Sequence, residues 1–118
     1  MKTILVAEDN DSNYILMTYI LKRSYQILRA KNGQEAVDLV DKGGIDMVLM
    51  DVKMPVMDGL EATAKIREKY PDLPVVALTA NAFESDRDQA MKAGCNDFLS
   101  KPVSSAKCLS VIENLIGK

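Results

Sequence analysis

Short apolar runs alternate along the chain with longer segments whose apolar residues recur every three or four positions. Five runs have the length and composition of β-strands, namely residues Thr3–Ala7, Gln26–Ala30, Met47–Met50, Val75–Leu78 and Asp97–Leu99. The third and fourth runs are almost continuously apolar, as strands buried on both faces of a sheet usually are. The alternation of the two patterns predicts βαβ units around a parallel sheet.

Five helices are expected after these strands, beginning near Ser12, Gln34, Leu60, Ser85 and Ser105. Apolar residues at helical spacing predict their buried faces. These residues include Ile15 and Tyr19 in the first helix, Ala36, Val37 and Val40 in the second, Leu60, Thr63 and Ile66 in the third, and Leu109, Ile112, Leu115 and Ile116 in the last. The expected N-terminal caps are Asp11 for the first helix, Asp58 with Gly59 for the third and Ser104 for the last.

Glycine and proline punctuate the chain between these elements, at Gly43–Gly44, Pro71, Pro74, Gly94 and Pro102. There is no internal repeat, low-complexity tract or linker. The pattern therefore predicts one (βα)5 unit of the α/β class, in which residues 1–118 form a single domain. Right-handed crossovers place helices on both faces of such a doubly wound sheet.

The composition narrows the possible functions. The chain of 118 residues has 17 acidic and 15 basic side chains, a formal net charge of -2, two Cys and no His. Direct binding to nucleic acid or to a membrane is not expected, because the chain has no basic stripe, no signal peptide and no run of membrane-spanning length. The lack of His excludes histidine-dependent catalysis on this chain. Two widely spaced Cys suit a reduced, cytoplasmic setting.

Polar side chains follow four of the five strands. Glu8 and Asp9 follow the first, Asp51 the third, Thr79–Ala80 the fourth, and Ser100–Lys101–Pro102 the fifth. Ligands of doubly wound sheets bind beyond the carboxyl ends of the strands. If the first, third, fourth and fifth strands are neighbours, these residues converge on one pocket.

These residue types suit phosphoryl transfer. Clustered carboxylates repel one another unless a cation is present, and Mg²⁺ prefers carboxylates with waters and phosphate oxygens. A carboxylate can accept a phosphoryl group as an aspartyl phosphate, while a lysine and a hydroxyl stabilise the phosphoryl oxygens. Taken one at a time, each residue is more often a helix cap or a solvated turn residue. The combination of three carboxylates, a hydroxyl and a lysine favours the functional interpretation.

Four segments resemble the receiver domain of two-component response regulators, the CheY-like family. They are Val6–Asn10, Met50–Gly59, Ala77–Ala82 and Phe98–Pro102, and the likeness covers essentially the whole chain. The resemblance implies a flavodoxin-like sandwich with a parallel sheet in the strand order 2-1-3-4-5.

The resemblance also implies a role for each residue of the predicted site. Asp51 would be the phosphoacceptor, taking its phosphoryl group from a phosphohistidine of a histidine kinase or of a histidine phosphotransfer domain. Asp9, Asp51 and the backbone carbonyl of Lys53 would bind Mg²⁺, and Glu8 would help to hold it through water. Lys101 would contact the phosphoryl group.

Thr79 and Phe98 match the switch pair of the family. The hydroxyl would move to the phosphoryl group and the ring would turn inward, which would alter the surface of the fourth helix, fifth strand and fifth helix. The Lys101–Pro102 peptide bond would be cis. Lys53 and Asn81 are candidates for tuning the lifetime of the acyl phosphate, although both are equally consistent with solvated loop side chains.

Two alternatives remain open from the sequence. Phosphatases of the haloacid dehalogenase type combine a nucleophilic Asp, a Thr or Ser, a Lys and a magnesium-binding acidic pair on a similar sheet. They carry a second acid two residues after the nucleophile, where this chain has Lys53, and the acidic pair comes later in their chain. The second alternative is an interaction module that has lost phosphorylation, against which the intact set of site residues argues.

As a receiver the chain would not be a turnover enzyme, but would catalyse its own phosphorylation and dephosphorylation. We expect a monomer or a weak, phosphorylation-dependent dimer. The segments Leu78–Ala82 and Gly94–Pro102 are most like receivers attached to hybrid sensor kinases. If the domain comes from such a protein, its parent would be a histidine kinase.

Overall fold

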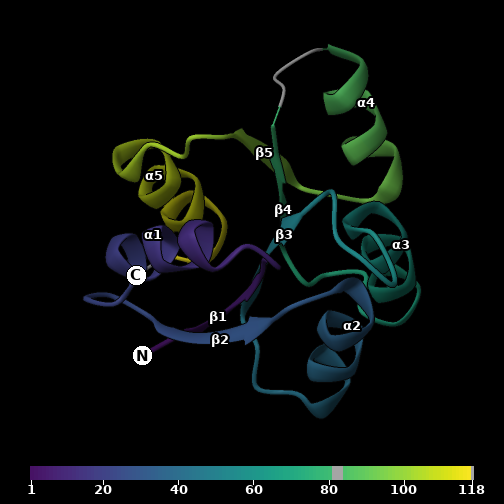
Figure 1. The fold of residues 1–118 in the computed structure, drawn as a ribbon. Helices are drawn as coiled ribbons and strands as arrows, with labels where there is room; N and C mark the ends of the chain where they lie inside the picture. The colour runs from purple at the N-terminus through teal and green to yellow at the C-terminus, as the bar shows by residue number, and fades with distance from the viewer. Residues whose placement is uncertain (81–83, 118) are drawn as a thin grey trace.

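The structure is a computed structural model that describes residues 1–80 and 84–117. Asn81 lies outside these residues. Strands and helices alternate through the described part of the chain (Figure 1): β1 Thr3–Ala7, α1 Asp11–Leu21, β2 Gln26–Ala30, α2 Gly33–Lys42, β3 Met47–Asp51, α3 Gly59–Lys69, β4 Val75–Thr79, α4 Glu84–Ala93, β5 Asp97–Ser100 and α5 Ser105–Ile116.

The strands form one parallel sheet in the order β2-β1-β3-β4-β5, as the resemblance implied. In this order Ala7 pairs with Met50, Asp51 with Leu78, and Thr79 with Ser100. The carboxyl ends of β1, β3, β4 and β5 therefore lie side by side at one edge. Figure 1 shows α1 and α5 on one face of the sheet and α2, α3 and α4 on the other.

Side-chain alternation along each strand supplies two separate cores. On the face covered by α2, α3 and α4, the buried residues include Leu5, Val48, Met50, Val75 and Ala77. On the face covered by α1 and α5, they include Ile4, Met47, Leu49, Val76 and Leu78. All five residues of β3 and of β4 are buried, which confirms the prediction from their continuous apolar runs.

The first helix differs from the prediction in its cap. Asn10, not Asp11, is the N-cap, because Asn10 has an extended backbone and its Oδ1 accepts a hydrogen bond from the Asn13 amide at 3.0 Å. Both residue types cap well, so the sequence did not distinguish them. Asp11 lies in the first turn of α1, where it forms an ion pair with Arg29. Asp58 and Ser104 are the caps of α3 and α5, as predicted.

The predicted buried face of α1 is wrong. Ile15 and Tyr19 are exposed, by 52% and 65%, whereas Met17 and Leu21 are buried against the sheet. Nearly every position from 14 to 21 is apolar or aromatic, so the periodicity did not define a single face. Only packing against β1, β3 and α5 selects which side is buried.

The bounds of β1 and β2 and the start of α5 match the prediction, and α1, α2, α3 and α4 each begin one residue earlier than predicted. Strands β3, β4 and β5 each extend one residue further, so Asp51, Thr79 and Ser100 are the last residues of their strands. These residues continue the ladder before the chain turns. Among the described residues, no helix is both long and apolar enough to cross a bilayer.

A close backbone approach brings α3 against the end of β3. A Cβ atom added to Gly59 would lie 2.0 Å from the carbonyl oxygen of Asp51, and the Gly59 amide donates to the Val52 carbonyl at 2.8 Å. Only glycine allows this approach without a shift of the backbone. The Asp58–Gly59 pair therefore begins the helix and also packs it directly behind Asp51.

Candidate functional site

A cavity of about 300 Å³ lies at the carboxyl edge of the sheet, where the sequence predicted a pocket. Its lining includes all the predicted residues at the ends of β1, β3 and β4, together with Lys101 after β5. These residues are Glu8, Asp9, Asp51, Thr79, Ala80 and Lys101. The strand order and register account for this convergence, because the four strands are adjacent and the ends of neighbouring strands are offset by at most one residue.

Three carboxylates form the acidic part of the cavity. One carboxylate oxygen from each of Glu8, Asp9 and Asp51 lies within 4.8 Å of the other two. Glu8 and Asp51 are buried, with 1% and 6% of their surface exposed, while Asp9 is exposed. Oxygen donors of this number and kind suit a hard divalent cation that retains some of its waters.

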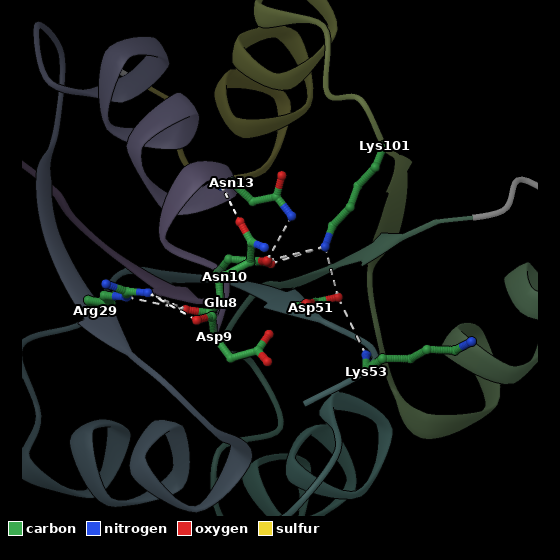
Figure 2. A network of polar contacts seen from close by, with 8 residues as sticks. All are labelled: Glu8, Asp9, Asn10, Asn13, Arg29, Asp51, Lys53 and Lys101. Atoms are coloured by element: carbon green, nitrogen blue, oxygen red, sulfur yellow. Dashed lines mark hydrogen bonds and ion pairs between the residues drawn. The ribbon is translucent and has the colours of Figure 1, made fainter. Parts of the chain in front are cut away.

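Lys101 joins two of these carboxylates. Its Nζ lies 3.1 Å from Glu8 Oε2 and 3.2 Å from Asp51 Oδ1. Figure 2 shows the side chain reaching from the end of β5 toward both carboxylates. One ammonium group therefore compensates part of the negative charge that the sheet gathers at this edge.

Burial raises the pKa of Asp51 to about 6, from an ordinary value of 3.8. The neighbouring Glu8 carboxyl raises the pKa further, and the Lys101 ammonium opposes the shift. The direction follows from desolvation, because a carboxylate removed from water loses its hydration, and a second acid nearby makes ionisation harder. A cation bound beside Asp51 would therefore stabilise the ionised form of this buried carboxyl group.

Three residues that were not predicted from the sequence, Asn10, Asn13 and Arg29, hold Glu8 and its neighbours. Asn13 Nδ2 donates to Glu8 Oε1 at 3.1 Å, and Asn10 caps the helix on which Asn13 lies. Arg29 of β2 donates to the carbonyl oxygen of Glu8 from Nε at 3.2 Å and from Nη2 at 3.1 Å. None of the three is the first residue after a buried strand: Asn10 and Asn13 lie beyond the turn after β1, and Arg29 lies within β2. The apolar pattern therefore did not mark them as site residues.

Lys53 and Pro102 lie in the loops that flank the cavity. The backbone amide of Lys53 donates to Asp51 Oδ1 at 3.4 Å, while its side chain is exposed and extends away from Asp51 (Figure 2). In this orientation the Lys53 ammonium is not a second cation beside Asp51. The Lys101–Pro102 peptide bond is cis.

Thr79 and Phe98 face the same side of the sheet. Phe98 pairs with Ala77, two residues before Thr79, and paired residues of neighbouring strands point to the same face. Thr79 is buried and lines the cavity, whereas Phe98 is partly buried against the core under α2, α3 and α4. The guanidinium carbon of Arg87 lies 5.4 Å from the centre of the Phe98 ring. The two residues are neighbours in the sheet, but Phe98 is outside the cavity lining.

Residues 4–113 match the protein family described as the response regulator receiver domain. Hybrid signal transduction histidine kinase B of Dictyostelium discoideum is 41% identical over 123 residues, which cover 92% of this chain and 6% of that protein. The polar-differentiation response regulator DivK of Brucella anthropi is 33% identical over 119 residues, which cover 98% of this chain and 97% of DivK. The chain thus spans a small part of one relative and nearly all of the other.

Two solved structures have the same fold. A chain in the co-crystal structure of the Saccharomyces cerevisiae histidine phosphotransfer signaling protein Ypd1 with the receiver domain of Ssk1 has a TM-score of 0.92 and 32% identity, over 98% of this chain and 88% of that one. The receiver domain of the sensor histidine kinase PA1611 of Pseudomonas aeruginosa, with a magnesium ion in its active site cleft, has a TM-score of 0.91 and 35% identity, over 99% and 98%.

The match extends over all five strands and over the turns that carry the cavity residues. It argues against the haloacid dehalogenase alternative, which the chain order of the acidic residues had already disfavoured. The chain belongs to the response regulator receiver domain family of two-component phosphorelay systems.

Proposed function

We propose that Asp51 is the phosphoacceptor of this receiver. The observation that carries the proposal is the environment of its carboxylate, which lies 3.2 Å from Lys101 Nζ and has oxygens of Glu8 and Asp9 within 4.8 Å. Glu8 shares the Lys101 ammonium and the acidic neighbours, but only Asp51 ends the central strand β3. The residues 1–118 then act as a single receiver domain.

The acidic cluster fits a magnesium ion. Glu8, Asp9 and Asp51 offer carboxylate oxygens, and the loop after β3 brings the backbone of Lys53 to the same cavity. We assign these residues to the metal, with the Lys53 carbonyl as the main-chain ligand and Glu8 acting through water. Bound Mg²⁺ supplies positive charge that stabilises the oxygens of the phosphoryl group during transfer.

The transfer itself requires only one nucleophile from this chain. An Asp51 oxygen forms a P–O bond while the P–N bond of the donor phosphohistidine breaks. The departing imidazole nitrogen keeps the electron pair and takes up a proton from water. Lys101 lies 3.2 Å from Asp51 and is placed to donate to the transferred group. Hydrolysis of the acyl phosphate by water releases inorganic phosphate and returns Asp51 to its carboxylate. The domain acts on its own phosphoryl group and not on a separate substrate, so it is not a turnover enzyme in the usual sense.

Thr79 and Phe98 would transmit the modification. The Thr79 hydroxyl is buried in the cavity wall, and Phe98 lies beside it on β5 with Arg87 of α4 over its ring. Thr79 and Phe98 lie on the same face of the sheet. Movement of the Thr79 hydroxyl toward a phosphoryl oxygen would therefore leave space that the Phe98 ring can enter. The ring then turns inward and changes the surface of α4, β5 and α5.

The phosphodonor is a histidine kinase or a histidine phosphotransfer domain. Two findings support this class of partner, namely the hybrid histidine kinase among the relatives and the phosphotransfer protein in the co-crystal structure with a similar receiver. We propose that the domain functions in the cytoplasm as a monomer or a weak, phosphorylation-dependent dimer. It requires no contact with nucleic acid or membrane.

The lifetime of the acyl phosphate depends in this proposal on Lys53 and Asn81. Lys53 is exposed, lines the cavity and is two residues after the acceptor, so a change of its side-chain rotamer would bring the ammonium toward the cavity mouth. The variants Lys53→Ala and Asn81→Ala should change the rate of dephosphorylation measured on purified phosphoprotein. Unchanged rates in both variants would assign them to the solvent-exposed loops without a kinetic role.

Acetyl phosphate with Mg²⁺ tests the central proposal. We expect the intact mass to increase by one phosphoryl group, and we expect no increase with Asp51→Asn or after chelation of the metal. Asp58→Asn is a matched control, because Asp58 is exposed and caps α3 outside the cavity lining. No mass gain in the unsubstituted protein would favour a phosphorylation-independent interaction module, and a gain that survives Asp51→Asn would place the acceptor elsewhere.

A further inference from the structure

Arg29 connects β2 to the turn that carries two of the three acidic residues. Its Nε and Nη2 both donate to the carbonyl oxygen of Glu8, at 3.2 and 3.1 Å, and Nη2 also reaches the carbonyl oxygen of Asp9 at 3.4 Å. Figure 2 shows the guanidinium group beside Glu8 and Asp9, on the side away from Lys101 and Asp51. Arg29 therefore contacts the main chain of both residues without lining the cavity.

Two further contacts hold the guanidinium group in place. Nη2 lies 2.8 Å from Asp11 Oδ1, and the guanidinium carbon lies 4.4 Å from the centre of the Tyr14 ring. Only 19% of the Arg29 side chain is exposed. The guanidinium group is planar and is already held by the Tyr14 ring and the Asp11 carboxylate. Each additional hydrogen bond therefore costs the Arg29 side chain little conformational entropy.

These contacts bear on the direction of the Asp9 carboxylate. Asp9 is exposed, and among the described residues its side chain has no hydrogen-bond or ion-pair partner. The direction of its side chain is therefore set by the backbone of the turn. Hydrogen bonds to the carbonyl oxygens of Glu8 and Asp9 fix the two peptide planes on either side of the Asp9 Cα atom. Arg29 thus controls where the exposed carboxylate of the cluster lies.

We propose that Arg29 is a positioning residue for divalent-cation binding, which holds the Glu8–Asp9 turn in the conformation that the cation requires. This inference rests on the proposed function of the acidic cluster as a Mg²⁺ site. The charge of Arg29 acts in the opposite direction, because a guanidinium group near the cluster repels a cation. The hydrogen bonds prevail because they reach the ligand backbone directly, whereas the charge is already paired with Asp11.

Substitutions can separate the two effects. Arg29→Lys keeps the positive charge and loses the planar set of N–H donors. Arg29→Ala loses the charge and the donors. Outer partners that orient metal ligands typically contribute 10-fold to 100-fold to metal affinity, so we expect both variants to bind Mg²⁺ about 10-fold more weakly. Arg23→Ala is the matched control, because Arg23 is exposed and follows α1 outside the cavity lining. Affinity is measured from amide chemical shifts during titration with MgCl₂.

A second measurement distinguishes positioning from general stabilisation. Mg²⁺ that binds the folded state adds to the free energy of unfolding in proportion to its affinity. A purely structural role would lower the stability of Arg29→Lys equally with and without Mg²⁺. If Arg29 positions the turn, a fixed MgCl₂ concentration should raise the free energy of unfolding by less in Arg29→Lys than in the unsubstituted protein. Positioning also predicts that saturating Mg²⁺ restores the rate of phosphorylation by acetyl phosphate.

Three outcomes are decisive. Weaker binding in Arg29→Lys with recovery at saturating Mg²⁺ supports the proposal. An affinity of Arg29→Lys within about twofold of the unsubstituted protein, or tighter binding by Arg29→Ala, overturns it. If the unsubstituted protein shows no response to Mg²⁺, the proposed function of the cluster fails and the positioning role fails with it. The conservative Lys variant keeps the test available if Arg29→Ala does not fold.

Discussion

Lys101 Nζ lies between two buried carboxylates, 3.1 Å from Glu8 Oε2 and 3.2 Å from Asp51 Oδ1. The three residues come from three different strand ends, so this arrangement exists only in the folded chain. Asn13 also donates to Glu8, at 3.1 Å, which leaves Glu8 with a partner if the ammonium moves. Lys101 is thus available to exchange a carboxylate of the metal-free site for a phosphoryl oxygen.

Lys101→Met should destabilise the metal-free protein and raise the pKa of Asp51 above its present value of about 6. Removing one partner of a buried ion pair leaves uncompensated charge, and we expect a loss of roughly 3 kcal/mol at pH 8 in urea unfolding. Mg²⁺ should recover part of this loss. Lys65→Met is the control, because Lys65 is exposed on α3. Equal stability of the two variants would contradict the shared ion pair.

Asp51→Asn should change how stability depends on pH. The pKa of Asp51 is about 6 in the folded protein against an ordinary 3.8, so between these values the folded state keeps a proton that the unfolded chain has released. Stability contributed by the protonated acid is therefore lost as pH rises through this window. Without metal, the Asn variant should be more stable than the parent above pH 6, by on the order of 1–3 kcal/mol, and the difference should vanish near pH 4.

Urea unfolding of both proteins from pH 4 to pH 8 measures this difference directly. All other titrating groups are common to the two proteins, so the difference curve isolates Asp51. A difference that does not vary with pH would contradict the raised pKa. Mg²⁺ should reverse the order of stability at neutral pH, because only the parent offers the third carboxylate.

Gly59→Ala should impair both stability and phosphorylation. The added methyl group would lie 2.0 Å from the Asp51 carbonyl oxygen, so α3 or the end of β3 has to move. We expect a loss of roughly 3 kcal/mol and slower phosphorylation by acetyl phosphate. Gly44→Ala is the control: its φ is +82° and no described atom lies within 4 Å of the added Cβ. That variant should lose about 1–2 kcal/mol through backbone strain, with an unchanged phosphorylation rate.

Arg67→Met should reduce stability without affecting the site. The guanidinium group donates to the Gly94 carbonyl at 3.0 and 2.7 Å, to Asn96 Oδ1 at 2.9 Å, and to three carbonyls of the connection from α3 to β4. Loss of these charged hydrogen bonds should cost roughly 2–4 kcal/mol in urea unfolding. Lys69→Met removes the same charge from an exposed pair and should cost less than about 0.5 kcal/mol. The rate of phosphorylation at saturating Mg²⁺ should be unchanged in both variants. Slower phosphorylation of Arg67→Met would contradict the claim that Arg67 stabilises the fold without affecting the site.

The predicted residues of the cavity share one property, which is that each lies at the end of a strand or directly after it. The points where apolar runs stop in the sequence mark the strand ends. These points predicted four residues of the cavity, namely Glu8, Asp51, Thr79 and Lys101. Parallel connection then brings those points to one edge, whatever the lengths of the intervening helices. This part of the site follows from topology alone.

Residues that act from within a helix or from a different strand were not found. Arg29 occupies an ordinary polar position of the edge strand β2, and Asn13 is one of several polar residues in the first half of α1. The contact of Asn13 with Glu8 depends on how α1 packs against the sheet, and that of Arg29 depends on the pairing of β2 with β1. The same packing of α1 exposes Ile15 and Tyr19, whose burial was predicted wrongly.

Hydrophobic periodicity and chain breaks are local properties, and they were enough to predict the strands, the approximate starts of the helices and the residues at the carboxyl edge. The buried face of α1, its cap at Asn10 and the position of Lys101 between two carboxylates are apparent in the folded chain alone. Those features depend on distances between segments far apart in the chain. Packing sets such distances, and no local pattern encodes them.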